Sequence, residues 1–269
     1  MRHQWIAALG VFSVLRGITL IPAAFRAIKL PDRKTLADVL PAATYARWRA
    51  LREQYMGKDK DVERQRPAVA LGRLRSAAYQ ESGLAGGPDV RGVVDGLRRK
   101  HKVRRNQLPP AWRTVRFDNA RAMLKDAARL DTPDVPCFIQ ALDGLEDEIE
   151  LARQRANAWA RGDIEALRNL HRDMTLEEML EENCGRALLR ALTEGDDAAA
   201  RRAKKMLDDM EWHARWAGVE AEQHWLAAAE EALQKNASTF AVLPLNDVLR
   251  ADGPVAKLRQ RGYLVEEPR

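Results

Sequence analysis

The sequence predicts an α+β fold that is predominantly helical, with a small α/β-like sheet formed by both chain ends and a large helical block between them. Three observations support this prediction. The 269 residues are 46% hydrophobic and 31% charged, as in a soluble globular protein. Residues 31–237 show helical patterns separated by proline and glycine, and residues 238–269 end the chain as strand, helix and strand. We therefore expect a single domain over residues 1–269.

Residues 1–30 have two interpretations. An apolar run from Trp5 to Phe25 follows a basic start, which is typical of a signal peptide or a membrane anchor, although Arg16 interrupts the run and opposes both. Membrane association would then use residues 5–25. The alternative is a buried helix followed by a core strand in GITLIPAAF, residues 17–25. The residues alone leave this choice open.

The helical block begins with helices bounded by proline and glycine. Pro41 opens the first and Gly57 ends it, and its apolar side chains recur on one face: Tyr45, Trp48, Leu51 and Tyr55. A second helix starts near Pro67 and stops at Gly83, and its inward residues are Val69, Leu71, Leu74 and Ala78. A third enters through Pro88. Residues 106–117 then predict a short strand around Val115, because two prolines exclude a helix there.

The second half of the block is more plainly helical. Asp118 is expected to cap a helix over residues 119–130. Residues 135–163 predict one long amphipathic helix that ends at Gly162. Further helices are expected over residues 175–192 and from Asp196 to about Gln234, the latter with a break near residues 216–218.

The chain end predicts a strand, a helix and a strand. The apolar run STFAVLPL, residues 238–245, is typical of a buried parallel strand. Pro254 starts the helix and Gly262 follows its end. Residues 263–267, YLVEE, are then the returning strand. These strands need partners, which the N-terminal run and the short strand near Val115 are expected to provide.

With these elements in order, the chain resembles the TraB/GumN family, a bacterial group related to the Tiki-type metalloproteases. The resemblance covers about residues 30–269 and rests on KTLADVLPAATYARWRAL, on GDIEALRNL after the long helix, and above all on FAVLPLNDVLRADGPVAKLRQRGYLVE. The residues that match the family's C-terminal pattern are Phe240, Asp252, Gly253, Arg261, Gly262, Tyr263 and Val265.

The resemblance also implies a metal site that this chain has lost. Family members gather a divalent metal, such as Zn2+ or Mn2+, with two G-x-x-H turns and a glutamate. Here Pro244 takes the place of the second turn's glycine and Asp247 that of its histidine, and the first turn is absent. Ala27 and Lys29 lie where the glutamate is expected. A chain that begins after the family's first strand and turn would explain the N-terminal loss, but not the replacement at Asp247.

A second departure lies in the last long helix. Where family members carry Arg-Asn before a tryptophan, this chain has Glu222 and Gln223 before His224 and Trp225. The losses predict a protein with no cofactor, no recognised metal ligand and no identified catalytic residue, which binds a peptide or another protein. The alternative is a metal-dependent hydrolase or peptidase of the same family whose altered site uses Asp247.

The two cysteines, Cys137 and Cys184, fit no metal-ligand spacing. They are either small buried hydrophobic residues or one disulfide formed in an oxidising compartment. The family resemblance favours a periplasmic or envelope location and therefore the disulfide. A truncated core in residues 1–30 would instead fit the cytoplasm. The oligomeric state has no signature in the sequence.

The remaining motifs have plain interpretations. The net charge of +6 excludes no partner. The basic run LRRKHKVRR, residues 97–105, is a candidate for binding nucleic acid or anionic lipid, but we favour a solvated helix end. No aromatic residue interleaves it, which argues against nucleic acid. We interpret the acidic run at residues 143–150 as a solvent-exposed face. His171, His213 and His224 lack a nucleophile motif, and the last two lie among packing aromatic residues: Trp212, Trp216 and Trp225.

Overall fold

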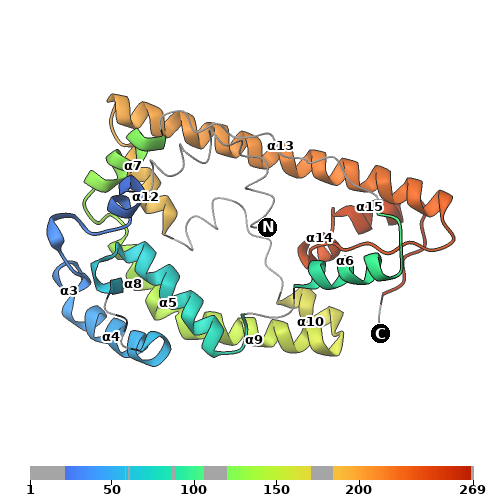
Figure 1. Ribbon diagram of the computed structural model, residues 1–269, viewed down its shortest axis with the longest axis horizontal. Helices are drawn as coiled ribbons and strands as arrows, with labels where there is room; N and C mark the ends of the chain where they lie inside the picture. The colour runs from blue at the N-terminus through green and yellow to red at the C-terminus, as the bar shows by residue number, and fades with distance from the viewer. Residues whose placement is uncertain are drawn as a thin grey trace. The chain divides into compact units, whose positions relative to one another are not determined.

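The computed structural model describes residues 22–57, 59, 61–85, 89–105, 120–170 and 184–267, and these are mainly helical (Figure 1). The chain divides into two compact units. The first contains Met1–Glu81, Arg116–Glu146 and Leu176–Asp209, and the second contains Ser82–Val115, Asp147–Thr175 and Met210–Arg269. The single domain expected from the sequence stays a prediction.

The first unit is built from short and medium helices. Its described elements are η1 (Pro31–Arg33), α3 (Leu36–Val39), α4 (Ala42–Met56), η2 (Asp61–Arg64), α5 (Pro67–Glu81), α7 (Ala120–Arg129), α8 (Val135–Asp143), α12 (Gly185–Thr193) and the first part of α13 (Ala198–Lys235). Residues 22–27 are also helical. The strand proposed for residues 17–25 is therefore wrong over residues 22–25, and residues 17–21 lie outside the described part of the chain.

Two of the predicted helices are confirmed by their boundaries. Helix α4 follows Pro41 and ends before Gly57, whose φ of 62° is in the left-handed region that glycine adopts without strain. Helix α5 starts at Pro67, where the missing N–H of proline would have no partner in any case. Its buried residues repeat at helical spacing and face the core: Pro67, Ala70, Leu71, Leu74 and Ala78.

The core of the first unit lies where α5 packs against α4 and α8 (Figure 1). Trp48 from α4 and Phe138 from α8 are fully buried there, and their ring centroids are 5.7 Å apart with planes inclined by 56°. Aromatic pairs in such tilted geometry stabilise a core beyond the area that they bury. Leu36, Leu71 and Leu142 are also fully enclosed.

The second unit contains α6 (Val90–Lys100), most of α9 (Leu145–Arg161), α10 (Ile164–Asn169), the rest of α13, α14 (Leu245–Leu249) and α15 (Pro254–Gln260). Asp163 caps α10, because its side chain accepts a hydrogen bond of 2.9 Å from the backbone N–H of Ala166. Helix α15 runs from Pro254 to just before Gly262, as predicted. Gly262 has a φ of 90°, a conformation that a side chain would strain.

The predicted sheet is wrong. Among the described residues, the structure has no strand, and its one isolated β-bridge joins Lys29 to Gln65. Residues 238–243 and 263–267 were expected to be strands but have no regular structure. An extended segment needs a partner for its backbone N–H and C=O groups. The N-terminal partner that we expected is helical over residues 22–25, so an apolar run alone did not produce a strand.

Two helix predictions need smaller corrections. The long helix expected over residues 135–163 is broken into α8 and α9 at Gly144, because glycine costs about 1 kcal/mol in a helix interior relative to alanine. Helix α13, in contrast, is continuous through residues 216–218, where a break was expected. The strand near Val115, the cap at Asp118 and residues 175–183 of the helix expected at 175–192 lie outside the described residues. In the described part of that helix, α12 begins only at Gly185, after Cys184 in a left-handed conformation.

Candidate functional site

The residues at the position where the resemblance implies a second metal-binding turn form a short helix. Pro244 precedes α14, and Asp247 lies in its first turn, partly buried. A carboxylate in the first turn of a helix is favoured by the helix dipole. Asp247 is not the residue that caps α14, because that position belongs to Pro244, which has no capping side chain. The structure thus gives Asp247 a local role within α14.

Glu222, which the sequence marked only as a departure from the family pattern, holds this segment to α13. Its carboxylate accepts hydrogen bonds from the Arg250 guanidinium and from the Lys257 ammonium group. The Glu222 side chain is only 15% exposed, so the two cations offset the cost of removing its charge from water. Arg250 also lies 2.9 Å from a carboxylate oxygen of Asp252. Glu222 thus fixes both helices, because it binds Arg250, which follows α14, and Lys257, which lies within α15.

Gly253 lies at a turn that leaves no room for a side chain. A Cβ atom at Gly253 would lie 2.5 Å from the carbonyl oxygen of Asp247 and 3.1 Å from that of Arg250. Both contacts are with backbone, which cannot move aside as a flexible side chain can. Helices α14 and α15 pack against each other around this turn. The glycine therefore lets the two helices approach.

The chain end is fixed by further ion pairs. Arg261 donates to Glu230 on α13 at 2.6 Å. The Glu267 carboxylate accepts a hydrogen bond of 2.7 Å from Arg168, which lies within α10, and another from Arg259 on α15. The hydrogen bonds from Arg168 and Arg259 lower the pKa of the Glu267 carboxyl below its ordinary value. These contacts restrain the segment at several points after α13.

Several apolar side chains of the C-terminal segment, which is the part of the chain after α13, are exposed. Phe240 is 78% exposed and Leu264 is 88% exposed, although Phe240 lies in the run that we predicted as a buried strand and Leu264 in the predicted returning strand. Val242 and Val248 are exposed as well. Ion pairs thus restrain this segment while several of its large apolar side chains face solvent.

Ala27 and Lys29, which lie where the resemblance implies a metal-binding glutamate, have structural roles. The carbonyl oxygen of Ala27 accepts a hydrogen bond of 2.9 Å from the Arg66 guanidinium. Lys29 is exposed and forms the bridge with Gln65. These residues belong to the first unit, whereas Asp247 belongs to the second.

The most buried polar pair of the first unit is Arg66 and Asp134, which are 2% and 0% exposed. The guanidinium donates to four carbonyl oxygens at the C-terminal end of α7, those of Ala127, Ala128, Leu130 and Asp131. Burial lowers the pKa of Arg66, and the charges of Asp134 and Asp131 counteract this effect. Arg66 therefore caps α7 by a contact between distant parts of the sequence.

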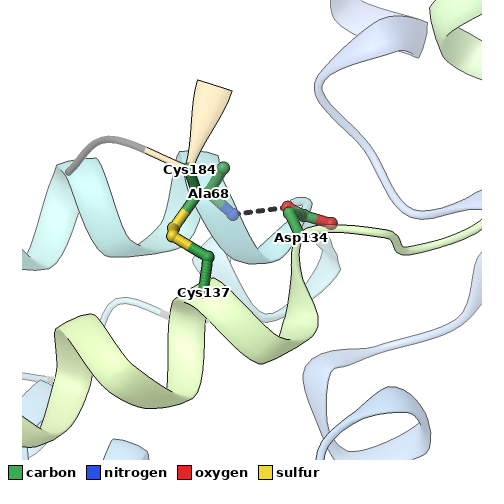
Figure 2. Close-up of a disulfide and its surroundings, with 4 residues drawn as sticks. All are labelled: Ala68, Asp134, Cys137 and Cys184. Carbon is green, nitrogen blue, oxygen red and sulfur yellow. Dashed lines mark hydrogen bonds between the residues drawn. A yellow bond between two sulfur atoms is a disulfide. The ribbon is translucent and has the colours of Figure 1, made fainter. Parts of the chain in front are cut away.

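Asp134 caps the N-terminal end of a helix, whereas Arg66 caps a C-terminal end. One carboxylate oxygen accepts a hydrogen bond of 2.7 Å from the backbone N–H of Ala68, in the first turn of α5 (Figure 2). The other oxygen is buried and has no hydrogen-bond partner among the described residues. The negative carboxylate also suits the positive end of the helix dipole. Nothing in the sequence distinguished Arg66 or Asp134 from the many other charged residues.

The sulfur atoms of Cys137 and Cys184 are bonded in the structure, next to the Asp134 cap (Figure 2). Cys137 lies on α8, and Cys184 comes directly before α12 with a φ of 57°. The bond links two helices of the first unit across 47 residues of sequence. Cys184 is almost fully buried.

The remaining candidates from the sequence are the acidic run and the histidines. In the acidic run, the carboxylates of Asp143 and Glu146 are exposed and both contact Arg47, while Leu145 and Ile149 are buried. The run is thus a solvent-exposed helix face, as interpreted. The Nδ1 atom of His224 is buried without a hydrogen-bond partner among the described residues. His171 and the side chain of His213 lie outside them.

No group of three or more His, Cys, Asp or Glu side chains in the described ranges is placed to hold a metal ion. No helix in that part of the chain is both long and apolar enough to cross a membrane.

The chain matches a known protein family. Residues 20–267 match the model of the TraB/PrgY/gumN family, which is nearly the whole chain. No curated protein and no solved structure matches the chain.

Proposed function

The chain belongs to the TraB/PrgY/gumN family, and from that premise we propose that it binds a peptide or another protein through its C-terminal segment and catalyses no reaction. The observation that carries the proposal is the exposure of Phe240 and Leu264 on a segment that several ion pairs restrain. Restraint lowers the entropy that binding must overcome, and exposed large apolar side chains provide the favourable contact.

The residues at two positions that depart from the family pattern also support a role other than hydrolysis. Asp247 supports α14, and the oxygens of Glu222 are occupied by two cations. One carboxylate without partners rarely holds Zn2+ or Mn2+. The alternative of a metal-dependent hydrolase requires Asp247 to act as a metal ligand, which gives a direct test.

We expect Asp247→Ala to change the free energy of unfolding by about 0.5 kcal/mol or less, because the variant loses only the interaction with the helix dipole. Neither wild type nor variant should gain thermal stability from excess Zn2+ or Mn2+. Thermal melts with and without each metal measure both effects. Asp208→Ala, which removes an exposed carboxylate from α13, is the matched control. A rise of several degrees in the wild-type Tm that Asp247→Ala abolishes would establish the hydrolase alternative instead.

Peptide binding is tested by selecting a displayed random-peptide library on the immobilised full chain. We expect enriched peptides with a shared pattern, and the double variant Phe240→Ser, Leu264→Ser should weaken their binding by roughly tenfold or more in fluorescence anisotropy. Phe25→Ser with Leu233→Ser removes the same two residue types from exposed positions elsewhere and should leave the affinity unchanged. Selected peptides that bind both double variants equally, or that are cleaved when metal is added, would contradict the proposal.

A further inference from the structure

The helix α6 and the residues after it carry most of the net charge of the chain. Residues 89–105 contain seven Lys and Arg and two Asp, so their net charge is +5 out of +6 for the whole protein. The excess is thus concentrated in one short segment. Such a local excess attracts anionic partners far more effectively than the same charge spread over the surface.

The same segment exposes a row of aliphatic side chains. Val90, Val93 and Leu97 are 60%, 52% and 53% exposed, and their spacing places them on one face of α6. Val103, just beyond the helix, is 56% exposed. At the same spacing, Arg91 and Arg98 flank this row on one side and Lys100 on the other. The helix is therefore amphipathic, and its apolar face is turned to solvent.

Local contacts hold the basic residues beyond α6 against the helix end. Lys102 has a φ of 54°, which turns the chain back so that the backbone N–H of Val103 donates to the carbonyl of Arg98 at 3.0 Å. The Arg98 side chain donates in turn to the Val103 carbonyl at 3.4 Å. Residues 101–105 thus form one surface with α6 rather than a loose extension.

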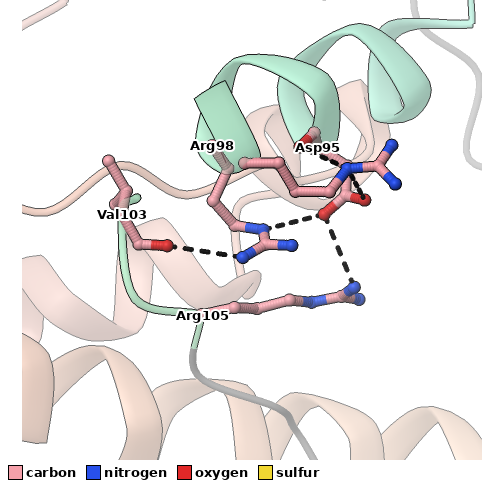
Figure 3. A network of polar contacts seen from close by, with 5 residues as sticks. Asp95, Arg98, Val103 and Arg105 are labelled. Carbon is pink, nitrogen blue, oxygen red and sulfur yellow. Dashed lines mark hydrogen bonds and ion pairs between the residues drawn. The ribbon is translucent and has the colours of Figure 1, made fainter. Parts of the chain in front are cut away.

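Asp95 organises the arginines on the polar side of the helix (Figure 3). Its carboxylate lies 2.8 Å from Arg98, 3.6 Å from Arg99 and 3.8 Å from Arg105. Lys100 and Lys102 form no ion pair with the described residues. One aspartate therefore fixes the orientation of three guanidinium groups while the surface keeps a large positive excess.

We propose that α6 with residues 101–105 binds the surface of an anionic lipid bilayer, lying in the plane of the interface. The aliphatic row would enter the boundary of the acyl chains, and the flanking Arg and Lys side chains would contact the lipid phosphates. Nucleic acid offers the charge but no apolar counterpart for Val90, Val93 and Leu97, and the segment has no aromatic residue to stack on bases. This surface is built from other residues than the C-terminal segment, so the proposal does not depend on the proposed function.

Vesicle flotation of the full chain tests the proposal. We expect binding to vesicles of phosphatidylglycerol mixed with phosphatidylcholine, weaker binding to phosphatidylcholine alone, and a decrease as salt is added. Lys100→Ala with Lys102→Ala should lower the partition coefficient by roughly 25-fold, at about fivefold for each charge. Val93→Ser with Leu97→Ser should lower it by at least about tenfold, because the aliphatic contact is lost.

Matched controls separate this surface from the rest of the molecule. Lys125→Ala with Lys205→Ala removes two exposed lysines elsewhere, and Val219→Ser with Leu233→Ser removes two exposed aliphatic residues elsewhere. Each control should stay within about twofold of wild type.

Equal binding to neutral vesicles, as an apolar anchor at residues 5–25 would give, overturns the proposal. An unchanged affinity of the Val93→Ser, Leu97→Ser variant also overturns the proposal. Charge alone would then explain the binding, and a nucleic acid would be an equally good partner. Equal losses in the controls also overturn it.

Discussion

We expect Arg66→Ala to lower the free energy of unfolding by about 3 to 5 kcal/mol, because it leaves several buried groups without partners. Four carbonyl oxygens at the end of α7 lose their donor, as does the carbonyl of Ala27. Asp134 keeps a fully buried carboxylate and loses the nearby positive charge. Urea unfolding followed by tryptophan fluorescence measures the change, since Trp48 reports on the core of the same unit.

Two variants make the test of Arg66 specific. Arg66→Lys keeps the charge but not the planar fork of donors, so it should lose a large part of the same stability. Arg49→Ala removes an exposed arginine from α4 and should change the free energy of unfolding by no more than about 0.5 kcal/mol. If Arg66→Ala is too unstable to purify, Arg66→Lys alone still gives the result. A variant Arg66→Lys as stable as wild type would show that the bonds to α7 contribute little.

The second large effect is expected from the disulfide. Replacing both Cys137 and Cys184 by serine should lower the free energy of unfolding by about 3 to 4 kcal/mol, because the bond closes a loop of 47 residues and restricts the unfolded chain. Adding a reductant to wild type should produce a similar loss, and the double variant should not respond to it. Urea unfolding under both conditions provides the comparison.

Counting thiols in denatured, unreduced protein checks the premise of that prediction. Protein taken from its native compartment should contain no free thiol. Two free thiols would show that Cys137 and Cys184 are unbonded there, in which case the serine variants would measure only the packing of Cys184. The envelope location that favours a stable disulfide stays an expectation.

Local signals explain which elements could be predicted from the sequence. Helices α4, α5 and α15 were predicted because proline and glycine mark their ends and their apolar residues repeat at helical spacing. The break at Gly144 was missed, because the apolar pattern continues across it. The sheet was predicted from two apolar runs, and it was wrong because a strand depends on a partner elsewhere in the chain.

The contacts that organise each unit could not be predicted for a related reason. Glu222 meets Arg250 and Lys257 across 28 and 35 residues, and no local pattern distinguishes it from the other acidic residues of α13. Arg66 and Asp134 act on the ends of helices to which they do not belong. The resemblance identified the Asp-Gly pair at Gly253, but only the structure shows the two carbonyl oxygens that exclude a side chain there.

The position of Arg66 in the sequence has a consequence for synthesis on the ribosome. Its acceptors on and after α7 follow it by 61 to 65 residues. Helices α4 and α5 are therefore made well before the carbonyl groups that surround the guanidinium exist. A nascent chain that ends before Asp131 has a cation at the start of α5 that must remain in water, so the first unit cannot close its core at that stage. We therefore expect this part of the protein to become resistant to proteases only after translation has passed α7.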